Sequence, residues 1–158
     1  MLVAAILMLS LQQLQTSVPK PEEVGVFYHL DNQKLLPLER QTAVSEARWR
    51  MLGFGGQRVT AWIKGERSPV RLGRRPQFVL RAADPTKYQL YRYVSKKGRR
   101  EIVLAVGGRA QPMTVRCRVT EVEPQVYRFE PAEDLPPGEY GFSPSDSNET
   151  FNFGVGGA

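Results

Sequence analysis

Apolar and polar residues alternate along much of this chain with the two-residue period of a β-strand. The clearest example is residues 113–120, where every second position from Met113 to Val119 is apolar. Residues 59–64 show the same alternation. Because successive side chains of a strand point to opposite faces of a sheet, the pattern predicts half-buried strands in both places.

Turn residues divide the rest of the chain into short apolar stretches. Residues 24–38 contain a turn sequence at 31–33, and residues 88–106 contain a basic tip around Gly98. Both segments are predicted to be β-hairpins, because Asn, Asp and Gly favour the backbone of tight turns. Further strands are expected at 70–72, 77–81, 126–130, 140–142 and 151–155.

About nine or ten short strands between turns are typical of a β-sandwich or a barrel. We expect a mostly β fold, namely an antiparallel β-sandwich that is immunoglobulin-like in style. Residues 42–52 fit a helix or a strand, and this choice stays open.

The immunoglobulin-like style rests on one turn near the end of the chain. Leu135, Gly138 and Tyr140 have the spacing of a tyrosine corner, in which the tyrosine hydroxyl bonds to upstream backbone. Immunoglobulin domains carry a cysteine two residues after that tyrosine, where this chain has Phe142. An apolar contact is therefore expected in place of the disulfide.

The chain has 158 residues, enough for one domain with a core of its own. Its one cysteine, Cys117, cannot form an intramolecular disulfide, and with the one histidine, His29, it is too little for a Cys/His zinc site. We expect no metal and no cofactor.

His29 has no nucleophile motif beside it, and Cys117 is expected to be buried and inert. The sequence therefore predicts no catalytic residues and a protein that is not an enzyme.

The amino terminus carries an uninterrupted apolar stretch at residues 2–11. This is shorter than the roughly 20 residues that span a bilayer, and it has the length of a signal-peptide core. Residues 1–17 are expected to be a cleaved signal peptide and residues 18–158 a single β-sandwich domain. The alternative is a terminal strand or helix that is buried. Export would make the protein periplasmic or extracellular, without a transmembrane segment in the mature chain.

Several stretches of the chain resemble a set of exported bacterial β-rich proteins of uncharacterised function. The stretches are residues 24–28, 34–39, 65–71, 96–101, 137–140 (Pro-Gly-Glu-Tyr) and 151–155, which end in Phe-Gly-Val. The resemblance implies bacterial origin, export and a β-rich fold, and it implies no activity. In similar sequences a cysteine often stands where this chain has Asn152, so any disulfide there is lost.

The net charge of +6 is unevenly distributed along the chain. Residues 34–118 hold 20 Lys and Arg against 5 acids, about +15, whereas residues 119–158 hold 1 base against 8 acids, about −7. In one interpretation the acidic end pairs with the basic middle inside one fold. In the other, the basic residues form a face for an anionic partner.

The basic hairpin tip is the one candidate binding site, since cations hold phosphates while aromatic rings stack on bases. Its candidate residues are Tyr91, Tyr93, Lys96, Lys97, Arg99 and Arg100. The alternative is a solvated tip that protects the sheet from edge pairing.

Three functions are compatible with these observations. The leading expectation is a non-catalytic extracytoplasmic binding or structural module of unknown ligand, with an envelope protein or an anionic polymer as candidate partners. The second is a basic surface that binds an anionic polymer, such as an envelope glycan, lipid headgroups or nucleic acid. The third is a carboxylate-dependent hydrolase, which would need two carboxylates in one cleft.

Overall fold

Nearly all regular structure in this protein is β-strand. The computed structural model describes residues 17–49, 56–110 and 112–157. Within them the one helical segment is a 3₁₀ turn, Pro85–Lys87, in which the N–H of Thr86 donates to the Asp84 side chain. The expected mostly β fold is confirmed. The expected signal peptide lies outside the described residues, except for Ser17.

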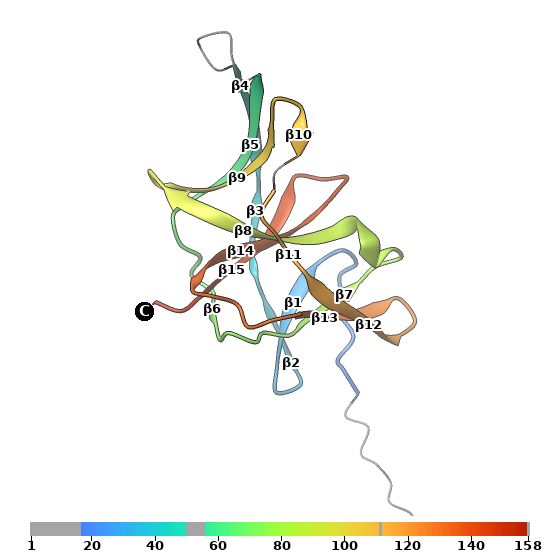
Figure 1. Ribbon diagram of the computed structural model, residues 1–158. Coiled ribbons are helices and arrows are strands. Elements are labelled where there is room, and N and C mark those ends of the chain that lie inside the picture. The colour runs from blue at the N-terminus through green and yellow to red at the C-terminus, as the bar shows by residue number, and fades with distance from the viewer. Residues whose placement is uncertain (1–16, 50–55, 111, 158) are drawn as a thin grey trace, which may run out of the picture.

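The strands form two sheets (Figure 1). The smaller sheet has the order β12-β13-β7-β1-β2. Its strands are β1 (Phe27–Asp31), β2 (Lys34–Pro37), β7 (Phe78–Arg81), β12 (Cys117–Glu123) and β13 (Val126–Pro131). All of its neighbouring strands are antiparallel.

The larger sheet has the order β3-β15-β14-β8-β9-β5-β4, with three short strands beside it. Its strands are β3 (Glu39–Thr42), β4 (Val44–Trp49), β5 (Gln57–Lys64), β6 (Arg71–Leu72), β8 (Tyr88–Lys96), β9 (Arg99–Val106), β10 (Arg109–Ala110), β11 (Thr114–Val115), β14 (Gly138–Pro144) and β15 (Glu149–Val155). The β6–β15 pair is parallel, whereas the main pairs are antiparallel.

Aromatic side chains from both sheets fill the space between them. Phe27 of the small sheet stacks on Phe142 of the large sheet, with ring centroids 4.0 Å apart. Phe78 packs edge-to-face with Phe142 at 4.9 Å and lies tilted against Phe153 at 4.8 Å, measured between ring centroids. Burial of such side chains removes a large apolar area from water and is the main stabilising contribution of a sandwich core. The antiparallel β-sandwich is thus observed, while its immunoglobulin-like style stays a prediction.

The large sheet also curls until its two edges meet. Its edge strands β3 and β4 are separated along the chain by Ala43 alone, yet β3 pairs with β15 and β4 pairs with β5. The Gln41 side chain supports this closure, since its amide donates to the Lys64 carbonyl at 3.1 Å and accepts from the Lys64 N–H at 3.2 Å. The strands from β3 to β4 therefore enclose an interior of their own.

Strands β14 and β15 separate that interior from the sandwich core. Tyr140 and Phe142 face the small sheet, whereas Glu139 and Gly141, one residue away on the same strand, face the enclosed interior. On β15, Phe151 and Phe153 alternate with Thr150, Asn152 and Gly154 in the same way. The two-residue period of these strands thus gives one apolar face and one polar face.

Both predicted hairpins are present. Strands β1 and β2 meet at Asn32 and Gln33, and strands β8 and β9 meet at Lys97 and Gly98. All four turn residues have positive φ, as a two-residue turn of type I′ requires.

The structure changes one prediction from the hydrophobic pattern and decides one choice that was open. Residues 113–120 were expected to form one strand, but the chain breaks at Arg116: β11 pairs with β8 in the large sheet and β12 with β13 in the small one. Val115 and Cys117 pack against the core, but β12 is an edge strand and Val119 is 44% exposed. In residues 42–52, where helix and strand stayed open, the described part forms strand β4.

The tyrosine corner is confirmed as a local structure. Tyr140 is fully buried, and its hydroxyl donates to the carbonyl of Pro136 at 2.6 Å. Leu135 is buried in the same core. The corner thus fixes the chain where it enters β14.

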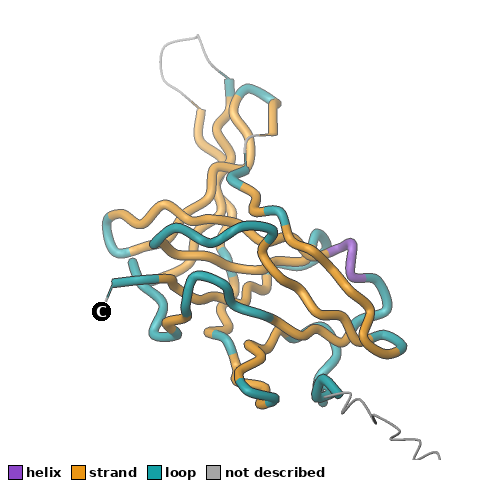
Figure 2. Tube along the Cα trace, turned by 60° about the horizontal axis from the view of Figure 1, so that its bottom comes forward, coloured by secondary structure: helices purple, strands orange, loops and turns teal. Residues whose placement is uncertain are grey.

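Strands β4, β5 and β10 and the end of β9 project from the sandwich as an arm (Figures 1 and 2). The small sheet does not extend over the arm, so this part of the large sheet has no second layer. No helix in the described ranges has the length and hydrophobicity needed to cross a membrane.

Candidate binding groove

The candidate site lies where the small sheet stops covering the large one. On β8, Leu90 is 1% exposed in the sandwich core, whereas Val94, on the same face of the strand, is 46% exposed. Arg92 lies between them, with its guanidinium 6.0 Å from the centre of the Tyr140 ring. The same sheet face therefore changes from a buried aromatic core into an open, cationic surface.

This open surface is hollowed beside the β8–β9 hairpin. The tip of the hairpin, with β4 and β5, surrounds a groove of about 400 Å³. The cationic residues that line it are Arg48, Arg58, Lys96, Lys97 and Arg99. They come from β4, β5, β8, the hairpin turn and β9, so residues distant in sequence meet here.

Two carboxylates hold several of these cations in place. Glu101 binds Lys96 at 2.5 Å and Arg99 at 2.9 Å, and Glu46 lies 3.3 Å from Arg48. Burial alone would raise the pKa of Glu101. The bonds from Lys96 and Arg99 outweigh the effect of burial and hold the pKa of this carboxyl below its ordinary value. Glu101 is therefore an ionised support under the groove, and the cations still outnumber the acids.

Arg58 differs from its neighbours because part of its guanidinium lacks a partner. Its Nε is buried without a hydrogen bond, as is the indole Nε1 of Trp62, four residues along β5. A buried donor without a partner costs free energy, and this cost is part of the local structure of β5. Sequence reasoning missed Arg58, although the alternation of residues 57–64 already places Arg58, Thr60 and Trp62 on one face.

The predicted site residues lie on opposite faces of the sheet. Lys96, Lys97 and Arg99 line the groove. In contrast, Tyr93 and Arg100 point into the enclosed interior, where they are 7% and 0% exposed. Tyr91 is half-buried beside Tyr93. The basic tip is therefore a three-residue cationic surface, without Arg100 and without stacking tyrosines.

Arg100 is held inside the protein by several acceptors. Its guanidinium binds both oxygens of Glu39, at 2.7 and 2.9 Å, and donates to the carbonyls of Gly65 and Lys64. Glu139 lies 3.9 Å away. A buried charge must be paired and hydrogen-bonded to remain ionised, and Arg100 meets both conditions. It is a structural residue of the closed sheet.

The charge asymmetry of the sequence is partly resolved by ion pairs within the fold. The acidic end and the basic middle meet in five pairs: Arg40–Glu149, Arg71–Glu139, Arg75–Asp134, Lys87–Asp146 and Arg100–Glu139. This supports the interpretation of internal pairing for those residues. The groove cations are different, because their acidic partners come from the basic segment itself.

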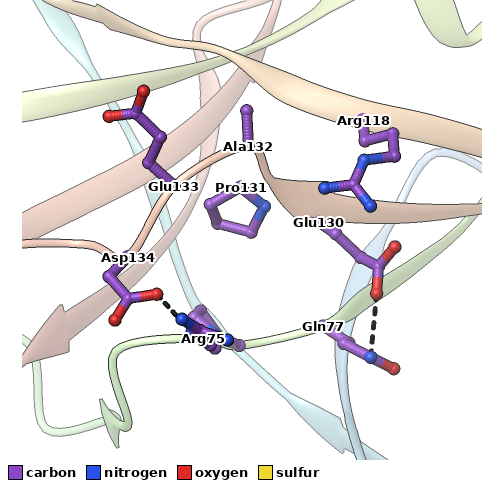
Figure 3. Close-up of a pocket in the computed structure, with 9 residues that line it drawn as sticks. Arg75, Gln77, Arg118, Glu130, Pro131, Ala132, Glu133 and Asp134 are labelled. Atoms are coloured by element: carbon purple, nitrogen blue, oxygen red, sulfur yellow. Dashed lines mark hydrogen bonds and ion pairs between the residues drawn. The ribbon is translucent and has the colours of Figure 1, made fainter.

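A second hollow lies between the 130–134 segment and residues 75–77, which precede β7 (Figure 3). Three carboxylates line it. Asp134 is bound by Arg75, and Glu130 accepts from the Gln77 amide at 2.8 Å. Glu133 points away from both of these carboxylates (Figure 3).

The two residues considered for catalysis lie apart from the groove. Burial lowers the pKa of His29, which packs beside Phe78 with ring centroids 6.2 Å apart. Cys117 was expected to be buried and is half-buried instead. Burial raises the pKa of its thiol to about 12, so it stays protonated at neutral pH.

No known protein family, curated protein or solved structure matches this chain. The resemblance to exported bacterial proteins therefore stays a prediction, and the function is inferred from the groove.

Proposed function

We propose that this protein is a non-catalytic binding module that holds an anionic polymer in the groove beside the β8–β9 hairpin. One observation carries the proposal: cations from four elements and the hairpin turn line a single groove. Clustered positive charge on a surface attracts anions and raises their association rate. This proposal joins the leading expectation of a binding module to the basic surface expected from the sequence.

The construction of the groove supports binding by preformed contacts. Lys96 and Arg99 are held by Glu101, and the Arg99 guanidinium lies 5.2 Å from the centre of the Trp62 ring. Side chains that are already ordered lose little conformational entropy when a ligand binds. Arg58 lines the same groove and adds a guanidinium, which can bind an anionic group through two parallel N–H bonds.

Export remains part of the proposal, supported by the apolar stretch at residues 2–11. In an extracytoplasmic compartment the polyanions are envelope or matrix glycans and lipid headgroups. The partner would then be found outside the cytoplasm.

Titration calorimetry with heparin, a sulfated glycan, tests the proposal. We expect binding whose logarithmic affinity falls linearly with the logarithm of salt concentration, because counterions are released. The double variant Lys97→Gln/Arg48→Gln should weaken binding by about three- to twentyfold at low salt, since each exposed ion pair contributes up to about 1 kcal/mol.

A matched control carries the same charge change elsewhere. Lys20 and Lys34 are exposed and lie outside the groove, so Lys20→Gln/Lys34→Gln lowers the net charge equally. Equal loss of affinity in both double variants would mean that net charge alone attracts the polymer. Such a result, or no binding at all, would contradict the proposal.

A further inference from the structure

The groove beside the hairpin does not end at Arg58. Arg58 and Glu101 also line an adjoining hollow of about 330 Å³, which extends over Val94 and Val103 to Met113. These residues lie on the uncovered face of the large sheet. Val94 and Met113 are 46% and 51% exposed, so this hollow has an open apolar floor.

The hollows continue toward the small sheet. Arg92 and Met113 also line a third hollow, of about 510 Å³, which reaches Arg116 and residues 132–136. Glu133 and Asp134 in turn line the hollow of Figure 3, of about 550 Å³, which reaches Arg118. Each hollow thus shares residues with the next, from the hairpin tip to strand β12.

We propose that these four hollows form one continuous groove that binds a linear acidic glycan along its length, an inference that rests on the proposed function. Cations recur along the whole path: Lys97, Arg58, Arg92, Arg116 and Arg118. A row of separated positive charges fits a chain that carries one anionic group per repeat. It does not fit a single compact anion, which would need the cations to converge.

The other lining residues favour a glycan over nucleic acid. Single-stranded nucleic acid is held largely by stacking on exposed aromatic rings. In the described part of the four hollows the one aromatic lining residue is Tyr140, which is fully buried. Acidic residues, including Glu101 and Glu133, also line the path. Carboxylates repel the anionic groups of both polymers, but they accept hydrogen bonds from sugar hydroxyls, of which a glycan carries more per unit than a nucleotide.

Heparin oligosaccharides of graded length provide the test, measured by titration calorimetry at one salt concentration. We expect affinity to increase as the oligosaccharide grows from two sugars until it spans the groove, because linked contacts act together. Arg118→Gln, at the far end, should weaken the longest oligosaccharide about two- to fivefold and leave the disaccharide unchanged. Lys97→Gln, at the near end, should weaken both.

A further variant separates directed binding from diffuse attraction. Arg58→Lys keeps the positive charge but removes the planar guanidinium, which can bind an anionic group through two parallel N–H bonds. We expect weaker binding of long and short oligosaccharides without a change in the urea midpoint. Unchanged binding would show that Arg58 contributes charge alone, and would contradict its role as a directed contact.

The outcomes distinguish the two proposals. Binding that is independent of length, with Arg118→Gln like the parent protein, would overturn the extended groove and leave the hairpin groove standing. No salt-dependent binding of any oligosaccharide would overturn both. Tighter binding of a single-stranded oligonucleotide of equal charge would overturn the assignment to a glycan.

Discussion

Strands β14 and β15 carry two cores of opposite chemistry on their two faces. Toward the small sheet, Phe142 and Phe153 pack among other aromatic rings. Toward the enclosed interior, Asn152 accepts from the Tyr93 hydroxyl at 2.8 Å and donates to the Glu39 carbonyl at 3.1 Å. Both faces are buried, although one carries aromatic side chains and the other carries polar side chains that are hydrogen-bonded.

The difference lies in how each core tolerates change. Apolar contacts are non-directional. The free energy of unfolding therefore falls mainly with the side-chain volume that a substitution removes from an aromatic core. A buried polar network requires every donor and acceptor to find its partner in a fixed geometry. The apolar core should therefore respond most to deletion, and the polar interior to small displacements.

The largest effect is expected from Phe142→Ala in the apolar core. Phe142 is fully buried and contacts rings from both sheets, so its removal leaves a cavity. We expect a loss of about 3–5 kcal/mol in the free energy of unfolding, measured in urea. Leu36→Ala on the edge strand β2, where the side chain is 42% exposed, is the control and should change stability by about 0.5 kcal/mol at most.

A single added methyl group should disturb the polar interior. A Cβ at position 141 would overlap the Tyr93 hydroxyl and the Asn152 Oδ1, which are bonded to each other. Gly141→Ala is therefore expected to cost about 1–3 kcal/mol in urea unfolding.

Gly73 provides the matched control, since a Cβ there has no atom within 4 Å. Gly73→Ala should be neutral or slightly stabilising. If Gly141→Ala were equally neutral, the interior would be loosely packed and the contrast between the two cores would fail.

Local features of this fold follow from the sequence, because their signals lie within a few residues. Turn residues around Gly98 predicted the β8–β9 hairpin, and the spacing of Leu135, Gly138 and Tyr140 predicted the corner. In both cases the backbone conformation is decided by residues that are adjacent in the chain.

The closed sheet and the groove could not be predicted in the same way. Their contacts join residues far apart in sequence, such as Arg100 with Glu39 and Arg48 with the β8–β9 hairpin. Arg100 follows the exposed Lys96 and Lys97 and the half-buried Arg99. No local feature of the sequence therefore distinguishes the buried arginine from its exposed neighbours. The break at Arg116 was missed because the period of apolar residues continues while the chain passes between sheets.

Tyr140 belongs to the apolar core through its ring and to a hydrogen bond through its hydroxyl. The ring stacks on Phe153 with centroids 5.6 Å apart, and the hydroxyl binds the Pro136 carbonyl. Tyr140→Phe keeps the ring and removes one buried bond, so we expect a loss of roughly 1–2 kcal/mol in urea unfolding. An unchanged midpoint would mean that the corner bond adds nothing to the stability of the ring contacts.

The smallest effect is the pH-dependent part of the stability, which comes from the charge of Glu39 in the polar interior. Burial alone would raise the pKa of this carboxyl, but hydrogen bonds, chiefly from Arg100, outweigh it and hold the pKa below its ordinary value of 4.5. A carboxyl with a depressed pKa in the folded state binds its proton more weakly there than in the unfolded chain. Its contribution to stability is therefore complete above about pH 4.5 and is lost as the pH falls through the folded value.

Glu39→Gln isolates this contribution, because the amide keeps the size of the side chain and cannot ionise. We expect the variant to be less stable than the parent protein at neutral pH, since the buried Arg100 loses its anionic partner. Urea unfolding between pH 7 and pH 3 should show this difference narrowing below about pH 4.5, by at most one proton's slope of about 1.4 kcal/mol per pH unit. Phe142→Ala supplies the comparison: its loss should stay constant over the same range, because no titrating group is removed. A constant difference for Glu39→Gln as well would show that the Arg100–Glu39 pair stabilises the interior by shape rather than by charge.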